Sequence, residues 1–477
     1  MTKRFLSLVM SLTLMLTLTA GCGKSGSEGQ SAAAPSGTAK ASTPSGQQDP
    51  ITITVSNWPK ETDAGYQIAQ SQLEIFKESY PYITLKTDEW TYDVNSFLPK
   101  AASGQLPTVY TTWFTEIQKI LDAGYSADIT EVMQKYNLDK DLNPDMLALV
   151  KRDGKYYGLP SSGYVMGLWY NVNLFREAGL LDEKGVPLFP KTYDELAETA
   201  KTIKDRTGKA GLFFPGKNNQ AGWYFMNIAW AFGAEFEQKV DGKWKAVFNS
   251  PEAVAALQYI KDLKWKYDVL NSNILTDVSE LFKLFGTDQV GMSFGTIDWM
   301  NVPINDYQMS KDNMAMSALP AGPSGNATLM GGNLYMLAPG TTPEQQDAAI
   351  KWLEVTGYTA KTDTLDLKGL EENYILHRDS GRIVGPLGLQ VWVNQARANA
   401  EKVVRDKYIT VNMDLWQDFV DNGATGMRAE EPVNCQELYK ALDVAIQTVV
   451  TDINADPQSV MDKLVEDFQR DYLDKAQ

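Results

Sequence analysis

Tryptophan and acidic side chains follow the strands expected near the start of the folded part of this sequence. Trp58 and Trp113 each come directly after an expected strand, and Glu61 and Asp63 lie in the loop that leads to the next expected helix. An indole offers a flat apolar surface with one N–H donor, and a carboxylate accepts hydrogen bonds from hydroxyl groups. We expect these four side chains to bind a hydroxyl-rich ring such as a sugar.

The sequence contains few residues for covalent or metal chemistry. It has one histidine, His377, and two cysteines, Cys22 and Cys435. This supply is too small for a common zinc cluster and does not favour a Ser-His-Asp or Cys-His arrangement. We therefore expect no metal and no cofactor. Paired carboxylates remain available, since a glycoside hydrolase needs only two Asp or Glu side chains about 5–10 Å apart.

Acidic and amide side chains alternate over residues 139–145, as in the first half of a calcium loop. Pro144 stands at the turn for which such a loop uses Gly, and Val150 stands where a bidentate Glu belongs. These departures favour a solvated loop. The pattern leaves open whether a calcium ion binds there.

The composition is that of an acidic, folded protein. The chain has 477 residues, of which 43% are hydrophobic and 22% charged, so it is long enough for two or three domains. Its formal net charge of -16 argues against nucleic acid as a partner, because an acidic surface repels phosphate. The 12 Trp and 22 Tyr exceed what packing alone usually requires, which favours a ligand-binding surface lined with aromatic side chains.

The first fifty residues predict export and anchoring. Basic residues precede an apolar stretch too short to cross a bilayer, which is typical of a signal peptide over residues 1–21. Cys22 follows small residues in a pattern that resembles the bacterial lipobox, although Thr19 stands where that pattern usually has Leu. We expect acylation of Cys22. Residues 22–50 are mostly Gly, Ser, Ala, Pro and Thr, and we expect them to form a flexible tether.

Strands and helices alternate at the start of the expected folded body. Apolar, β-branched stretches predict strands at 51–56, 83–86 and 109–112, with helical patterns between and after them. This order favours an open α/β sheet with helices on both faces, whose ligands bind beyond the carboxyl ends of the strands. Later helices begin with capping signals at Thr192, Ser250 and Thr342.

Short motifs recur in an ordered series through this body. They are 104–109 (GQLPTV), 153–160 (DGKYYGLP), 168–171 (LWYN), 190–196 (PKTYDEL), 248–253 (FNSPEA), 290–295 (VGMSFG) and 331–332 (GG). In order and spacing, the chain from Ile51 to the C-terminus resembles family 1 of the bacterial extracellular solute-binding proteins, the maltose-type receptors of ABC importers. Thr108 departs from the family pattern, which usually has Asp there.

This resemblance implies an α/β fold of the two-lobe periplasmic-binding-protein-like kind (type II). Each lobe would be a mostly parallel sheet flanked by helices, with the ligand cleft between the lobes. Chain crossings are expected near 163–168, 330–334 and 390–397. Lobe 1 would contain residues 51–165 and 333–393, and lobe 2 would contain residues 166–331 and 394–477.

The resemblance also implies further ligand-binding residues. Tyr164 would lie at the first crossing, and Trp223 would begin a lobe 2 helix that faces the cleft. Asp298 and Trp299 would follow the motif that ends at Gly295. Aromatic rings would then support the apolar faces of a sugar, while carboxylates bind the hydroxyls around its edge.

These features predict a lipid-anchored receptor on the outer face of the cell membrane. It would capture a mono- or oligosaccharide and deliver it to the transmembrane permease subunits of an ABC importer. It would catalyse no reaction and bind no nucleic acid. It would act as a monomer. Two alternatives stay open: a cell-surface glycoside hydrolase that uses paired Asp or Glu, and a receptor of the same fold for a non-sugar polar solute.

Overall fold

The computed structural model describes residues 51–63, 65–362 and 365–475. These residues belong to one compact unit, Asp49–Gln477. The expected signal peptide, the expected acylation of Cys22 and the expected tether lie outside the described residues. Within the described part, no helix combines the length and apolar character needed to cross a membrane.

Buried side chains form two separate hydrophobic cores, and these cores define two lobes. The core of lobe 1 includes Ile53 and Phe76, and the core of lobe 2 includes Trp169 and Phe213. The buried residues of the lobe 1 core lie within 53–159 and 330–358, and those of the lobe 2 core lie within 165–329 and 383–473. The chain therefore passes between the lobes more than once.

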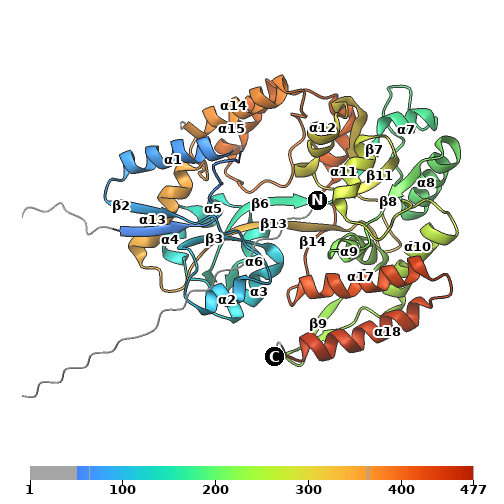
Figure 1. Cartoon of the computed structure of the whole chain (residues 1–477), viewed down its shortest axis with the longest axis horizontal. Coiled ribbons are helices and arrows are strands. Elements are labelled where there is room, and N and C mark those ends of the chain that lie inside the picture. Colours follow the sequence, from blue (N-terminus) through green and yellow to red (C-terminus); the bar gives the residue numbers. More distant parts are fainter. Residues whose placement is uncertain (1–50, 64, 363–364, 476–477) are drawn as a thin grey trace, which may run out of the picture. The chain divides into compact units, whose positions relative to one another are not determined.

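Three strands make up the main junction between the lobes. β6 (Leu159–Val165) runs antiparallel to β13 (Thr328–Leu337), and β14 (Met427–Ala429) pairs in parallel with the beginning of β13. Leu159 lies in the core of lobe 1, whereas Val165 lies in the core of lobe 2. Figure 1 shows β6 and β13 passing from one group of elements to the other.

Lobe 1 is a mixed sheet flanked by helices. Its strand order is β14-β13-β3-β1-β2, with β6 also paired to β13, and the β1 pairings with β2 and β3 are parallel. Its other elements are β1 (Ile51–Val55), β2 (Ile83–Thr87), β3 (Val109–Trp113), the hairpin β4 (Lys151–Arg152) and β5 (Lys155–Tyr156), the 3-10 helix η1 (Phe114–Glu116), α1 (Tyr66–Ser79), α2 (Phe97–Ala102), α3 (Ile117–Asp122), α4 (Thr130–Lys135), α5 (Leu138–Asp141), α6 (Pro144–Leu149) and α13 (Pro343–Val355).

Lobe 2 has a second sheet, of order β12-β7-β11-β8, in which β11 pairs in parallel with β8 while β7 pairs antiparallel with both β11 and β12. This sheet is therefore mixed and not mostly parallel as expected. Its elements are β7 (Gly167–Asn171), β8 (Ala210–Phe213), β11 (Val290–Gly295), β12 (Met314–Ser317), the hairpin β9 (Glu237–Val240) and β10 (Lys243–Ala246), α7 (Val172–Glu177), α8 (Tyr193–Thr207), α9 (Gln220–Phe232), α10 (Pro251–Trp265), α11 (Val278–Gly286), the 3-10 helices η2 (Ile297–Trp299) and η3 (Lys311–Asn313), α12 (Val302–Tyr307), η4 (Met413–Leu415), α16 (Gln417–Asn422), α17 (Cys435–Thr451), α18 (Pro457–Phe468) and the π-helical turn η5 (Gln469–Leu473).

The capping residues predicted from the sequence stand at the starts of the expected helices. Ser250 caps α10, and Thr342 forms a complete capping box at the start of α13. Thr192 caps α8, but the Glu195 carboxylate accepts a hydrogen bond from the N–H of Lys191 rather than from that of the cap residue. These local contacts satisfy backbone N–H groups that a helix leaves unpaired at its start.

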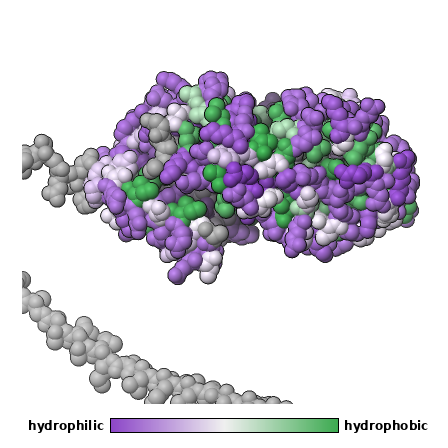
Figure 2. Space-filling view, turned by 90° about the horizontal axis from the view of Figure 1, so that it is seen from above, coloured by the Kyte–Doolittle hydropathy of each residue, from purple (hydrophilic) through white to green (hydrophobic). Residues whose placement is uncertain are grey.

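The stretch after α13 carries α14 (Leu365–Asp379) and α15 (Gln395–Asp406) and contacts both lobes. Ile383, within the stretch expected in lobe 1, lies in the core of lobe 2, and Leu389 packs against both cores. Trp392 then packs against the core of lobe 1. The exact lobe boundaries stay a prediction. From above, polar residues cover most of the visible surface and hydrophobic residues form separate patches (Figure 2).

Candidate functional site

Three aromatic side chains meet where the lobes join. The rings of Tyr164 in β6 and Trp223 in α9 meet edge to face, with centroids 6.1 Å apart. Trp223 also contacts Trp299 in η2 at 5.4 Å, and Trp299 packs edge-on against Phe282 at 5.6 Å. Tyr164 and Trp299 are half-buried, whereas Trp223 is only 8% exposed and belongs to the core of lobe 2. We call Tyr164, Trp223 and Trp299 the aromatic group.

Local structure fixes the positions of these rings. Gly331 lies against Tyr164, and a Cβ atom added at Gly331 would come within 2.3 Å of the tyrosine ring. The start of α9 is held by Asp443 of α17, whose carboxylate accepts hydrogen bonds from the N–H groups of Asn219 and Gly222 at 2.7 and 2.9 Å. This contact places Trp223 in the first turn of a helix whose start is fixed.

Carboxylates lie close to the aromatic group. Burial raises the pKa of Tyr164 well above its usual value, and the nearby Glu430 and Asp298 carboxylates raise it further. Asp298 is exposed in η2, next to Trp299. Glu430 follows β14 and accepts a hydrogen bond from the Tyr439 hydroxyl at 2.7 Å. The pKa of Glu430 is raised to about 8, mainly by burial and also by the Glu116 charge, although the hydrogen bond from Tyr439 lowers it.

Trp58 lies elsewhere. Its side chain is only 9% exposed and belongs to the core of lobe 1. The indole packs against Trp352 of α13, with ring centroids 6.1 Å apart. The strand-end position predicted a ligand contact, but α13 covers this side of the sheet and supplies an aromatic partner. Its ring contact is with Trp352 and not with Tyr164, Trp223 or Trp299, so we do not include Trp58 in the candidate site.

The other residues expected on lobe 1 are exposed. Trp113 ends β3, and its ring lies 5.3 Å from that of Tyr92 in an edge-to-face contact. Glu61 and Asp63 lie in the loop before α1, where Asp63 accepts a hydrogen bond from the N–H of Lys60. No contact joins Glu61 or Asp63 to the aromatic group among the residues described, and their role in binding stays a prediction.

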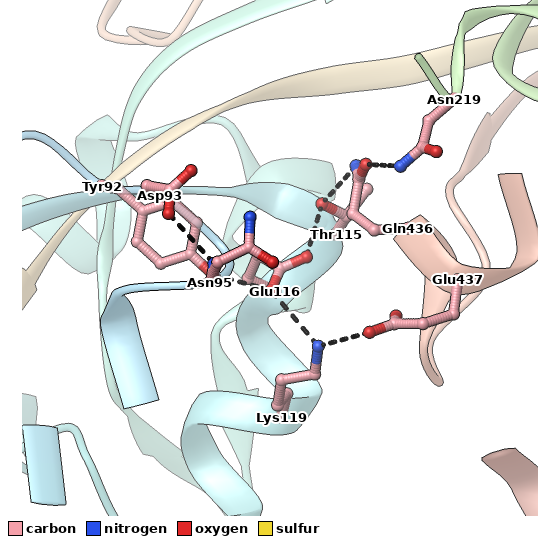
Figure 3. Close-up of polar contacts among 9 residues, drawn as sticks. All are labelled: Tyr92, Asp93, Asn95, Thr115, Glu116, Lys119, Asn219, Gln436 and Glu437. Carbon is pink, nitrogen blue, oxygen red and sulfur yellow. Dashed lines mark hydrogen bonds and ion pairs between the residues drawn. The ribbon is translucent and has the colours of Figure 1, made fainter. Parts of the chain in front are cut away.

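Polar side chains of the two lobes also meet each other at the junction (Figure 3). From lobe 1, the Tyr92 hydroxyl donates to the buried Glu116 carboxylate at 2.7 Å, and Lys119 Nζ lies 3.7 Å from the same carboxylate. Burial first, and then the Glu116 charge, raise the pKa of Tyr92. The Thr115 hydroxyl donates to Glu116 at 3.3 Å.

Lobe 2 completes this polar set from the first turn of α17 and the residue before α9. Gln436 donates to the Thr115 hydroxyl at 3.2 Å and accepts from the Asn219 amide at 3.0 Å. Glu437 forms an ion pair with Lys119 at 3.0 Å. The two lobes are thus joined by side chains as well as by strands.

The strand-end argument applied to Trp113 could have found Thr115 and Glu116, which follow β3 by two and three residues. No comparable signal marks Glu430, because the three residues of β14 show no recognisable strand pattern. Gln436 and Glu437 begin a helix that was expected, but their partners in lobe 1 lie more than three hundred residues earlier.

The described residues do not bring together three or more His, Cys, Asp or Glu side chains in a group that could hold a metal ion. In the 139–145 stretch, the Asn143 side chain accepts a hydrogen bond from the N–H of Asp145 and caps α6. Cys435 is fully buried, and burial raises the pKa of its thiol well above the usual value. A thiol in that state is a poor nucleophile.

Comparison with known proteins places the fold and the family. Residues 71–364 match the family model described as bacterial extracellular solute-binding protein. The chain belongs to this family. The family confirms the expectation of a binding protein rather than an enzyme, and it implies a location outside the cytoplasm.

Relatives of the chain among known proteins differ widely from it in sequence. A putative binding protein of Brucella abortus is 24% identical over 289 residues, covering 58% of this chain and 64% of that relative's length. The diacetylchitobiose binding protein DasA of Streptomyces coelicolor is 26% identical over 156 residues, covering 32% of this chain and 34% of its own.

A solved structure confirms the two-lobe α/β fold. The ABC transporter solute binding protein of Thermotoga lettingae bound with alpha-D-tagatose superposes with a TM-score of 0.66 at 20% identity. The superposition covers 89% of this chain and 99% of that one.

Proposed function

We propose that this solute-binding protein captures a carbohydrate between its two lobes and serves as the binding component of an ABC importer. The observation that carries the proposal is the aromatic group at the lobe junction, with carboxylates beside it. Aromatic faces bind the C–H surfaces of a sugar ring, and carboxylates accept hydrogen bonds from its hydroxyl groups. The names of the Streptomyces coelicolor and Thermotoga lettingae proteins, which refer to diacetylchitobiose and tagatose, support the same ligand class.

Binding of this kind makes and breaks no covalent bond. A ligand that touches both lobes favours their closed arrangement by the free energy of the contacts that only this arrangement allows. We further propose that the acylated Cys22 anchors the protein to the outer face of the cell membrane, that residues 22–50 form the tether, and that the monomeric closed form delivers the sugar to the transmembrane permease subunits.

A thermal-shift screen against mono- and oligosaccharides tests the proposed ligand class. A ligand that binds only the folded protein stabilises it, by about 2.7 kcal/mol at one hundred times its dissociation constant. At least one saccharide should raise the melting temperature of the parent protein. The Trp299→Ala variant should lose about half of this stabilisation, as for tenfold weaker binding, because Trp299 belongs to the aromatic group.

Trp265→Ala is the matched control, since Trp265 lies in α10 and its indole N–H donates to the Val449 carbonyl at 2.8 Å, within lobe 2. This variant should keep the saccharide-dependent shift. If no saccharide stabilises the parent but a non-sugar polar solute does, the proposed ligand class is wrong.

A further inference from the structure

The side chains that join the lobes form a compact polar set. It consists of Thr115 and Lys119 from lobe 1 and Asn219, Gln436 and Glu437 from lobe 2, and Figure 3 shows the two contact pairs connected through Glu116. The Lys119 to Glu437 ion pair measures 3.0 Å, and the hydrogen bonds on either side of Gln436 measure 3.2 and 3.0 Å. We call these five residues the interlobe clasp.

Each half of the clasp is fixed to the core of its own lobe. Lys119 lies in α3 between Ile117 and Ile120, which are both buried in the core of lobe 1. Glu437 lies in the first turn of α17, next to Leu438 in the core of lobe 2. If the lobes separate as rigid bodies, the clasp contacts must break, because neither half can follow the other.

The ion pair is sheltered enough to contribute to closure. The Lys119 and Glu437 side chains are 26% and 28% exposed. Burial lowers the pKa of Lys119, but the Glu116 and Glu437 carboxylates together outweigh burial and leave the pKa raised. Lys119 therefore stays charged, and it keeps a partner in its own lobe, Glu116, whether or not Glu437 is near.

The clasp lies next to the proposed ligand site. Asn219 precedes Trp223 by one helical turn, and Gln436 precedes Tyr439, whose hydroxyl donates to Glu430, by three residues. Any change in the clasp therefore acts at the same junction as the aromatic group.

We propose that the interlobe clasp stabilises the closed arrangement of the lobes, so that part of the free energy of closure comes from the protein itself rather than from its ligand. The clasp sets the ratio of closed to open molecules in the ligand-free protein. The contacts of a bound ligand then raise this ratio further. Loss of the clasp weakens ligand binding by up to the factor by which closure is weakened. The inference rests on the proposed function only in that ligand binding is taken to require closed lobes.

The test measures the distance between the lobes in ligand-free protein. Spin labels are placed at Ser71→Cys on α1 and Glu198→Cys on α8, both exposed positions, in a Cys22→Ser background. Cys435 is fully buried and should not react. Double electron–electron resonance then gives the fractions of molecules at the shorter and longer interlobe distances.

Glu437→Gln removes the charge of the pair but leaves Lys119 to neutralise Glu116. We expect the ratio of short to long distances to fall about fivefold, as for loss of one partly sheltered ion pair. The matched control is Asp88→Asn, because Asp88 pairs with Lys100 at 3.1 Å, with 30% and 21% exposure, entirely within lobe 1. This control should leave the distance distribution unchanged.

A second variant, Gln436→Ala added to Glu437→Gln, removes the hydrogen bonds as well and should lower the ratio further. A double variant with the distance distribution of the parent, or a parent found only at the longer distance, overturns the inference. Because no saccharide is present, this result is independent of the ligand screen. The clasp proposal can be refuted while a sugar still binds, and the sugar proposal can be refuted while the clasp still favours closure.

Discussion

Two buried glutamates make the stability of this protein depend on pH. Glu237 begins β9 and Glu431 follows β14, and their side chains are 6% and 7% exposed. Glu237 accepts a hydrogen bond from the N–H of Val433 at 3.2 Å, while its Oε1 is buried without a hydrogen-bond partner among the described residues. Burial, and then the Glu431 charge, raise the pKa of Glu237 to about 9.

The environment of Glu431 acts in the same direction. Burial raises its pKa to about 7, Arg428 lowers it and Glu235 raises it. Both carboxyl groups thus hold a proton in the folded protein at pH values where the unfolded chain has released it. The folded state therefore binds more protons, and the free energy of unfolding must fall as pH rises.

The size of the effect follows from the number of protons involved. Each such group lowers the free energy of unfolding by about 1.4 kcal/mol per pH unit between its unfolded and folded pKa values. For Glu237 this window runs from about pH 4.5 to about pH 9. Glu237→Gln removes this titration, so the decline of stability with pH should be shallower by about 1.4 kcal/mol per unit across that window.

Urea unfolding at pH 5, 6, 7 and 8 measures this slope for the parent and the variant. Other buried acids contribute equally to both proteins, so the difference between their slopes isolates Glu237 and its coupling to Glu431. Glu61→Gln, at an exposed position, is the control and should keep the slope of the parent. A Glu237→Gln variant with the same slope as the parent would refute the reasoning.

Three further substitutions test the site and the packing around it. Trp299→Ala should weaken saccharide binding about tenfold in calorimetry, with little change in stability, because the ring is half-buried; a large loss of stability with unchanged affinity would contradict this. Trp58→Ala should lower the free energy of unfolding by about 3–5 kcal/mol in urea, since it removes the partner of Trp352, and should leave affinity unchanged. Gly331→Ala should displace the Tyr164 ring and reduce affinity, and an affinity equal to the parent's would show that the ring does not touch ligand.

Local signals in the sequence were enough to place helix starts. Ser250 and Thr342 cap α10 and α13 as expected, because a cap depends only on residues three or four positions away. The half-formed box at Thr192 shows the limit of this reasoning. The Glu195 carboxylate can reach the backbone N–H of Thr192 or that of Lys191, and the sequence does not show which of the two it binds.

The candidate site was predictable only where a motif marked the place. Tyr164, Trp223 and Trp299 were expected from family position, and the structure brings them into contact. Trp58 was expected from its place after a strand, yet it packs against Trp352. A strand end indicates which edge of the sheet a residue occupies, but whether another element covers that edge is a long-range property.

The interlobe clasp could not be predicted from the sequence, because it too depends on long-range contacts. Lys119 and Glu437 are separated by 318 positions, so no periodicity or spacing links them. Their meeting depends on the pairing of β6, β13 and β14, which sets how α17 enters lobe 2 beside η1 and α3 of lobe 1. The strands that join the lobes therefore also determine which polar residues face each other across the junction. The proposed ligand site shares this junction, because α9 contacts β13 and η2 contacts β6.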